Sequence, residues 1–254
     1  MNKIALDEVT SYVERNIHKF HNRRLEAMRG IDLKDLLRKK NPYLFKAKHM
    51  ETASELIGSL LDARLSSSEE EIIGDFLEEL AIFVASKTLS GHKSGITGFD
   101  FEYETMDTHY IFALKSGENW GNNSQWIALE THCKAAMKTL STSGSKKNAK
   151  CMLGICYGRS KSSLKRGVIT QVSGQEFWYT ISGQKSFYQD IVEPIGNRAK
   201  ERNEAFSKAK AELVNKLTYE LLDEFCDKQS GHILWDKLVK FNSGNIPDDS
   251  QGIL

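Results

Sequence analysis

The segment from Phe99 to Lys115 constrains the fold most, because its side chains alternate with a period of two. In "FDFEYET", the aromatic residues Phe99, Phe101 and Tyr103 alternate with acidic residues, and the apolar run "HYIFALK" follows after a short polar stretch. Alternation of this kind is typical of half-buried strands, and a short polar stretch between two of them is typical of a hairpin. The chain is therefore expected to contain a β-sheet built around this hairpin.

The loop of the hairpin decides which residues face each other. A two-residue loop at Asp107–Thr108 predicts Asp100 opposite Lys115 and Glu102 opposite Ala113. Directly opposed side chains have Cβ atoms about 4.5–5.5 Å apart and lie on the same face. The sequence thus predicts a carboxylate beside an ammonium group at the far end of the hairpin. The structural alternative is an exposed cross-strand salt bridge, which contributes about 0–1 kcal/mol.

The rest of the chain supplies helices and further strands. Apolar spacing predicts helices over Ile4–Met28 and Thr52–Leu65, and a capping box of Ser68 with Glu71 predicts the start of another helix. A helix is expected over Ser124–Leu140, and "AKCMLGICYG" and "RGVITQV" are expected as strands. These elements predict an α/β (α+β) fold with a central mixed β-sheet flanked by helices. We expect a single domain over residues 1–254, with helical regions at 1–65 and 183–254 around a core at 66–182.

Composition excludes several classes of protein. The chain is 40% hydrophobic, no run approaches 18 apolar residues, and the N-terminal "MNKIALDEVTSYVERN" is amphipathic and contains acids. We therefore expect neither a transmembrane helix nor a secretory signal, and a cytoplasmic location. The four cysteines show no CxxC spacing and are expected to be free, buried thiols.

The formal net charge of +1 conceals a strong asymmetry. Residues 131–175 contain nine lysines and arginines and no aspartate or glutamate. Clustered positive charge is typical of a surface that binds a polyanion, and a window of this length favours nucleic acid over a merely solvated basic face.

Asp100 and Lys115 together suit the hydrolysis of a phosphodiester. Mg²⁺ takes oxygen ligands from one or two carboxylates, a backbone carbonyl, water and substrate phosphate. A neighbouring lysine can orient the attacking water and stabilise the charge that develops on phosphorus. The chain is therefore expected to hold a metal-dependent nuclease site.

A resemblance to known nucleases fits this expectation. An Asp on one strand, followed by an apolar strand that ends in (D/E)-x-Lys, resembles the PD-(D/E)xK nuclease superfamily. More specifically, "GDFLEELAIFVA", "GFDFEYE", "ALKSGENWGNNSQ" and "CYGR" look like the PmeII-type family of type II restriction endonucleases, over residues 41–244. The resemblance implies a restriction-endonuclease-like fold with its catalytic core at residues 66–182. It also implies a Mg²⁺-dependent homodimer that cuts double-stranded DNA at a short, near-palindromic site and leaves 5′-phosphates.

The sequence departs from the nuclease pattern at Ala113, two residues before Lys115, where the pattern has a metal-binding acid. Glu102 would face Ala113 across the expected hairpin and could replace that acid. Glu78 or Glu79, on the long helix, could also reach the site, as helix-borne glutamates do in nucleases of this fold. The third alternative is that the acid is absent. The backbone carbonyl of Leu114 is the expected non-carboxylate metal ligand.

DNA contacts are expected from two loops. The polar residues after Lys115 open a helix, where backbone N–H groups favour a phosphate and amide side chains can read adenine. The loop after the central strand carries cations suited to phosphate. The candidate DNA-binding residues are Asn119, Asn122, Asn123, Ser124, Gln125, Arg159, Lys161, Lys165 and Arg166.

Three functions remain open at this point. The first is a type II restriction endonuclease, for which a companion DNA methyltransferase acting on the same site is an expected partner. The second is a structure-selective or repair nuclease of the same fold. The third is a DNA-binding protein whose catalytic site has decayed, as Ala113 would then indicate.

Overall fold

The computed structural model describes residues 2–142 and 147–246. The chain forms two compact units. Unit 1 comprises Met1–Phe20 and Ile72–Asn197, and unit 2 comprises His21–Glu71 and Arg198–Leu254. Two helices, α1 (Leu6–Arg29) and α4 (Ala53–Thr88), contribute residues to both units. The expected single domain over residues 1–254 stays a prediction.

Unit 1 is built around a six-stranded mixed sheet with the order β1-β2-β3-β4-β6-β5. The strands are β1 (His92–Lys93), β2 (Phe101–Glu104), β3 (Thr108–Lys115), β4 (Asn148–Ile155), β5 (Ser163–Lys165) and β6 (Ile169–Ser173). The β3–β4 and β4–β6 pairs are parallel and the other pairs are antiparallel. The carboxyl ends of β3, β4 and β6 therefore lie at one edge of the sheet.

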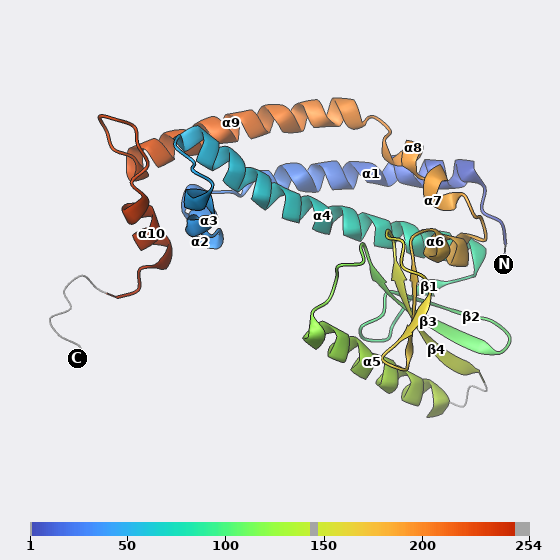
Figure 1. The fold of residues 1–254 in the computed structure, drawn as a ribbon. Coiled ribbons are helices and arrows are strands. Elements are labelled where there is room, and N and C mark those ends of the chain that lie inside the picture. The colour runs from blue at the N-terminus through green and yellow to red at the C-terminus, as the bar shows by residue number, and fades with distance from the viewer. Residues whose placement is uncertain (1, 143–146, 247–254) are drawn as a thin grey trace, which may run out of the picture. The chain divides into compact units, whose positions relative to one another are not determined.

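Helices cover both faces of this sheet (Figure 1). On one face, α4 and α6 (Gln175–Ser182) lie over β2, β3 and β4. The rings of Phe101 and Phe112 stack there at 4.5 Å and pack with Leu80 and Phe177 in one apolar core. On the other face, α5 (Asn123–Thr142) packs against β4, with Cys133 in a second core. Because both faces are covered, β4 carries the continuous apolar run that the sequence shows.

Short helices complete unit 1, and unit 2 is helical. In unit 1, α6 is followed by α7 (Phe187–Asp190) and α8 (Val192–Ile195). Unit 2 contains α2 (Leu33–Lys39), α3 (Pro42–Ala47), α9 (Ala199–Phe225) and α10 (Trp235–Ser243). Its own apolar core includes Leu56, Leu60, Leu217 and Leu221. The predicted α/β fold, a mixed sheet flanked by helices, is confirmed and is consistent with a restriction-endonuclease-like core.

The predicted helix start at Ser68 is wrong, because α4 runs unbroken from Ala53 to Thr88. The capping box lies at the true start of α4, where Thr52 and Glu55 each accept the other's backbone N–H at 3.2 Å. Within the helix, the Ser67 hydroxyl donates to the Ala63 carbonyl at 3.2 Å. Serine can satisfy its hydroxyl in this way inside a helix, so a local capping pattern does not force a break.

Two further expectations concern cysteines and membranes. All four cysteines, Cys133, Cys151, Cys156 and Cys226, are free and buried, as predicted. Among the residues that the structure describes, no helix has both the length and the apolar character needed to cross a bilayer.

Candidate active site

The hairpin that carries the expected site has a register different from the predicted one. Its turn closes between Thr105 and Thr108, where the Thr105 N–H donates to the Thr108 carbonyl at 2.8 Å, so the loop is one residue earlier than expected. Glu102 pairs with Ile111 and Glu104 with His109. Each of these pairs is thereby shifted by two residues, which keeps Glu102 and Glu104 on their predicted face. Phe99 is the exception, because it packs in the core of the face opposite that of Phe101.

Two predicted juxtapositions are therefore wrong. Asp100 does not lie opposite Lys115; its N–H donates at 2.7 Å to the carbonyl of Phe112, which is the residue that pairs with Phe101. Glu102 does not lie opposite Ala113, because it pairs with Ile111.

The Asp100 carboxylate is anchored to the β3 backbone. Its Oδ2 accepts a 2.6 Å hydrogen bond from the N–H of Leu114. Partial burial raises the pKa of this carboxyl above its ordinary value, while the Leu114 N–H and the cations Lys115 and Lys93 oppose that rise. An acid held by one N–H and two cations keeps its charge oriented at the end of the hairpin.

Lys115 is the last residue of β3 and is half-buried. Its carbonyl accepts from the N–H of Cys156 at 2.9 Å, which ties the ends of β3 and β4 together. Its Nζ lies 5.8 Å from the centre of the Trp120 ring, within the range of a cation–π contact. The ammonium group is thus held between the sheet and the loop that follows it.

Glu78 approaches this pair from α4. One turn before it, Gly74 packs so closely on Ser116 that a Cβ there would lie 3.3 Å from the serine Cβ. Burial raises the pKa of Glu78 to about 7, with a further rise from the charge of Asp100 and from Asp75, while Lys115 lowers it. Glu78, Asp100 and Lys115 therefore interact with one another, and we call them the carboxylate–lysine cluster.

Cys156 lies beneath this cluster. Burial raises the pKa of its thiol, and the charges of Glu78 and Asp100 raise it further, whereas Lys115 lowers it. The same three groups thus act on a fourth, buried residue. The thiol stays protonated and packs as a small apolar group in the core.

The other two candidate glutamates lie elsewhere. Glu102 contacts His109 Nε2 through Oε2 at 2.9 Å and His92 Nε2 through Oε1 at 3.3 Å. Glu79 forms an exposed pair with Lys19 at 3.4 Å. Of the three glutamates weighed from the sequence, the structure brings Glu78 to Asp100 and Lys115.

The Leu114 carbonyl lies on the Asp100 side of β3. In a strand, the N–H and C=O of one residue point the same way, and alternate residues share that direction. The Leu114 N–H points to Asp100, and the Phe112 carbonyl points to the Asp100 N–H. The carbonyl of Leu114 therefore points to the same side of β3 as Asp100, at a level that lies before the first residue of β2, Phe101.

Polar residues after Lys115 cap the N-terminus of α5. Asn122 and Gln125 form a capping box, in which the Asn122 N–H donates to Gln125 Oε1 at 2.9 Å and the Gln125 N–H donates to Asn122 Oδ1 at 3.1 Å. Ser124 donates its hydroxyl to the same Asn122 oxygen at 2.6 Å. These three side chains are engaged in capping, so a role in reading bases would require the cap to open. Asn119 is exposed.

The four cationic residues predicted to bind DNA differ in their contacts. Arg166 donates to Asn123 Oδ1 at 2.7 Å and lies 3.9 Å from Glu130, so it braces the start of α5. Arg159 and Lys161 are exposed and Lys165 is half-exposed. Among the described residues, none forms a hydrogen bond or ion pair with these last three side chains.

Sequence reasoning missed how tightly the loops at this edge interlock. The Glu118 carboxylate accepts the Ser160 N–H at 2.5 Å and so joins the loops after β3 and β4. A Cβ on Gly117 would lie 2.4 Å from the Tyr157 ring, and one on Gly174 would lie 2.2 Å from the Gly158 carbonyl. Glycine is required at such approaches, and the spacing of glycines just after the strands was the available signal.

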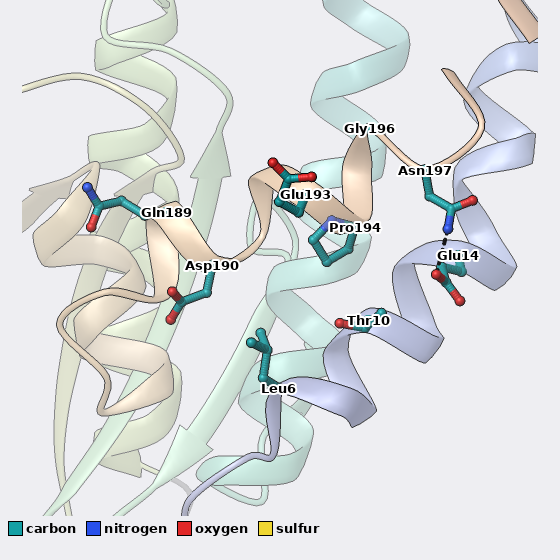
Figure 2. Close-up of a pocket in the computed structure, with 9 residues that line it drawn as sticks. All are labelled: Leu6, Thr10, Glu14, Gln189, Asp190, Glu193, Pro194, Gly196 and Asn197. Atoms are coloured by element: carbon teal, nitrogen blue, oxygen red, sulfur yellow. Dashed lines mark hydrogen bonds between the residues drawn. The ribbon is translucent and has the colours of Figure 1, made fainter. Parts of the chain in front are cut away.

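A separate hollow in unit 1 is lined by negatively charged side chains and is therefore unsuited to DNA (Figure 2). It has a volume of about 640 Å³ and lies between α1 and the α7–α8 segment. Glu14, Asp190 and Glu193 line it, and Glu14 accepts from the Asn197 amide at 2.6 Å. A phosphate backbone would be repelled here, so this face does not compete with the carboxylate–lysine cluster as a site for nucleic acid.

Comparison with known proteins supplies the family. No curated protein matches the chain. The family model described as "Type II restriction endonuclease EcoO109I" matches residues 7–203, which include the whole carboxylate–lysine cluster. The predicted type II restriction endonuclease is thus confirmed, whereas the narrower resemblance to the PmeII-type family stays a prediction. The chain belongs to the type II restriction endonuclease EcoO109I family, and it is a site-specific deoxyribonuclease whose substrate is DNA.

Proposed function

We propose that the protein is a Mg²⁺-dependent, homodimeric restriction endonuclease whose active site is the carboxylate–lysine cluster. It hydrolyses both strands of DNA at a short, near-palindromic site and leaves 5′-phosphates. The observation that carries the proposal is the convergence of Glu78, Asp100 and Lys115, from a helix and a hairpin, at the carboxyl end of β3. A companion methyltransferase for the same site stays a prediction.

The donor set fits Mg²⁺. No group of three or more His, Cys, Asp or Glu within residues 2–142 and 147–246 is arranged as a metal cage. Mg²⁺ does not require one, since it binds through one or two carboxylates together with water and substrate phosphate. The pKa values of both Glu78 and Asp100 are raised, and the two charges oppose each other, so a cation between them would relieve the repulsion. The Leu114 carbonyl would add a third oxygen.

The residues of the chain then take distinct roles. Glu78, Asp100 and the Leu114 carbonyl would hold the ion, which when bound polarises the phosphate and lowers the pKa of a water molecule. Lys115 donates hydrogen bonds to the attacking water and to a phosphate oxygen, and so stabilises the charge that grows in the transition state. The Leu114 N–H donates the hydrogen bond that keeps Asp100 in position. A carboxylate oxygen or an amide oxygen can accept this hydrogen bond.

Two-fold symmetry motivates the dimer. A near-palindromic site presents the same sequence on both strands, and two identical active sites related by a two-fold axis can cut both. The test is the size of the protein on one short duplex that contains the site, measured by sedimentation. A 1:1 complex that still cuts both strands would reject the dimer.

The first experiment is digestion of one long, unmethylated phage DNA in Mg²⁺. EDTA and Lys115→Ala serve as negative controls, and Glu79→Gln, which alters the exposed neighbour of Glu78, serves as the matched positive control. Discrete bands that vanish in both negative controls support the proposal, and their ends give the site and the cut position. Selective cutting of branched DNA would favour a structure-selective nuclease. A salt-sensitive gel shift without cleavage would show that the site has decayed.

A further inference from the structure

A second pocket lies beside the carboxylate–lysine cluster, on the α5 face of the sheet. It has a volume of about 420 Å³ and is lined by Glu118, Trp126, Ser160, Lys165, Arg166 and Gln171. We call it the Gln171 pocket. Pockets of about 300–1,000 Å³ accept small organic ligands, and this one combines an aromatic ring, an amide, a carboxylate and two cations.

Gln171 is the buried polar group of this pocket. It lies on β6, two residues after Ile169, and therefore on the face that α5 covers. Its side chain is only 6% exposed, and its Nε2 donates to Ser173 Oγ at a long 3.3 Å. Among the described residues, none donates to its Oε1. The Oε1 atom is therefore free to accept a hydrogen bond from a ligand that enters the pocket.

Trp126 connects the pocket to the cluster. Its ring lies 4.7 Å from that of Trp120, and the Trp120 ring in turn lies 5.8 Å from Lys115 Nζ. A continuous path of packed groups thus leads from the lysine to the pocket. Aromatic side chains at nucleic-acid surfaces stack on bases of any sequence.

The charges at the rim suit a single phosphate beside a base. Lys165 makes no ion pair among the described residues, whereas Arg166 is braced by Asn123 at 2.7 Å. Glu118 is fixed by the Ser160 N–H at 2.5 Å, and hydrogen bonds from that loop hold its pKa below the ordinary value. A fixed carboxylate accepts from an exocyclic amino group and repels a phosphate, so it orients a nucleotide with its base inward.

We propose that the Gln171 pocket binds one nucleotide unpaired from its partner strand, with its base against Trp126 and Gln171 and its phosphate at Lys165. This inference rests on the proposed function, because it makes the occupant a nucleotide of the DNA that is cut. The pocket would then contribute to recognition by holding a base outside the duplex, at a cost that is smallest where the base is already unpaired.

The first test uses the full chain and deoxyribonucleoside 5′-monophosphates in EDTA, with binding measured by calorimetry. We expect Gln171→Leu to weaken binding about tenfold, since it removes the amide and retains the volume. Gln189→Leu makes the same change in the acidic hollow and should have no effect. Lys165→Met, at the half-exposed rim, should remove the preference for a monophosphate over its nucleoside. If Gln171→Leu does not fold, Lys165→Met still tests the proposal.

The second test separates a nucleotide within DNA from a free one. Duplexes with a single bulged 2-aminopurine or a bulged abasic residue are compared in EDTA, by affinity and by fluorescence. Tighter binding of the bulged base, abolished by Gln171→Leu and retained by Gln189→Leu, supports a nucleotide within the strand. Binding of monophosphates alone, with the same dependence on Gln171, would overturn the proposal in favour of a free nucleotide.

The proposal is overturned if neither probe depends on Gln171 or Lys165. Its failure is distinguishable from failure of the proposed function, because cleavage of phage DNA in Mg²⁺ is measured separately. Cleavage without any dependence on Gln171 in the binding tests rejects the pocket alone. Base binding without cleavage rejects the proposed function alone.

Discussion

The N–H of Leu114 donates a 2.6 Å hydrogen bond to the carboxylate of Asp100, so the β3 backbone itself positions the acid at the end of the hairpin. An asparagine at position 100 can still accept this bond through Oδ1. The effect of its charge can therefore be separated from the effect of its position.

We expect Asp100→Asn to lower the rate of DNA cleavage by about 10³-fold or more, because loss of charge stabilisation at a metal site is worth several kcal/mol. DNA affinity in EDTA should not fall, since without a cation the Asp100 charge repels the phosphate and the asparagine does not. Single-turnover cleavage and fluorescence anisotropy measure the two quantities. Cleavage within tenfold of the wild type would remove Asp100 from the active site.

Glu78→Gln should stabilise the protein at alkaline pH while it abolishes cleavage. The pKa of Glu78 is raised from its ordinary 4.5 to about 7, so between these values the folded state binds more protons than the unfolded state. The free energy of unfolding of the wild type therefore falls as pH rises from 4.5 through 7. The variant with a neutral glutamine does not lose stability in this way.

The stabilising effect of Glu78→Gln should be near zero at pH 4.5 and reach about 1–2 kcal/mol above pH 7, after allowance for solvent screening. Urea denaturation at several pH values in EDTA checks it. Added Mg²⁺ should stabilise the wild type and leave the variant unchanged. A stability difference that does not vary with pH would contradict the raised pKa. Glu79→Gln is the matched control and should show neither effect, because Glu79 is exposed.

Glu102→Gln should leave cleavage within about threefold and lower stability instead. Glu102 meets His109 Nε2 at 2.9 Å, while His109 Nδ1 faces Glu104 at 3.1 Å. Two carboxylates thus meet the two nitrogens of one imidazole, and Glu102→Gln replaces one charged partner with a neutral amide. We expect a loss of about 1–2 kcal/mol, measured by urea denaturation. A large loss of cleavage with unchanged stability would instead place Glu102 in the catalytic site.

The exposed cations Arg159 and Lys161 should act through phosphate contacts. Replacing both by alanine is expected to lower the slope of log Kd against log salt by about two, since each phosphate contact contributes about one. Affinity should fall by the same factor for any DNA sequence. Lys138→Ala combined with Lys134→Ala, on the outer surface of α5, is the control for loss of two positive charges. A sequence-dependent loss would indicate base contacts.

The parts of the site that were predictable from sequence lie within one hairpin. Alternation identifies β2 and β3, and it places Asp100 and Lys115 near one end, because strand period is a local property. The register was missed by two residues, since period alone does not say where the turn closes, and the Thr105–Thr108 turn decides it.

Other features needed tertiary contacts that no local pattern contains. Three glutamates are candidates in sequence, with Glu78 and Glu102 close together and Glu79 after them, and the packing of α4 at Gly74 against Ser116 brings Glu78 to the site. The polar run after Lys115 was interpreted as a DNA-reading surface, yet Asn122 and Gln125 form a helix cap. Local signals for caps and for base contacts use the same residue types, so sequence alone cannot separate them.

The interlocked glycines at the carboxyl edge have a consequence for how this enzyme can be altered. Gly117, Gly158 and Gly174 bring three turns into van der Waals contact, so a larger residue at any of them would displace an atom of a neighbouring turn. A change made to alter specificity in one turn is therefore expected to shift the others, including the one that follows the lysine. Variants of this enzyme selected for a new target should be selected for turnover at the same time.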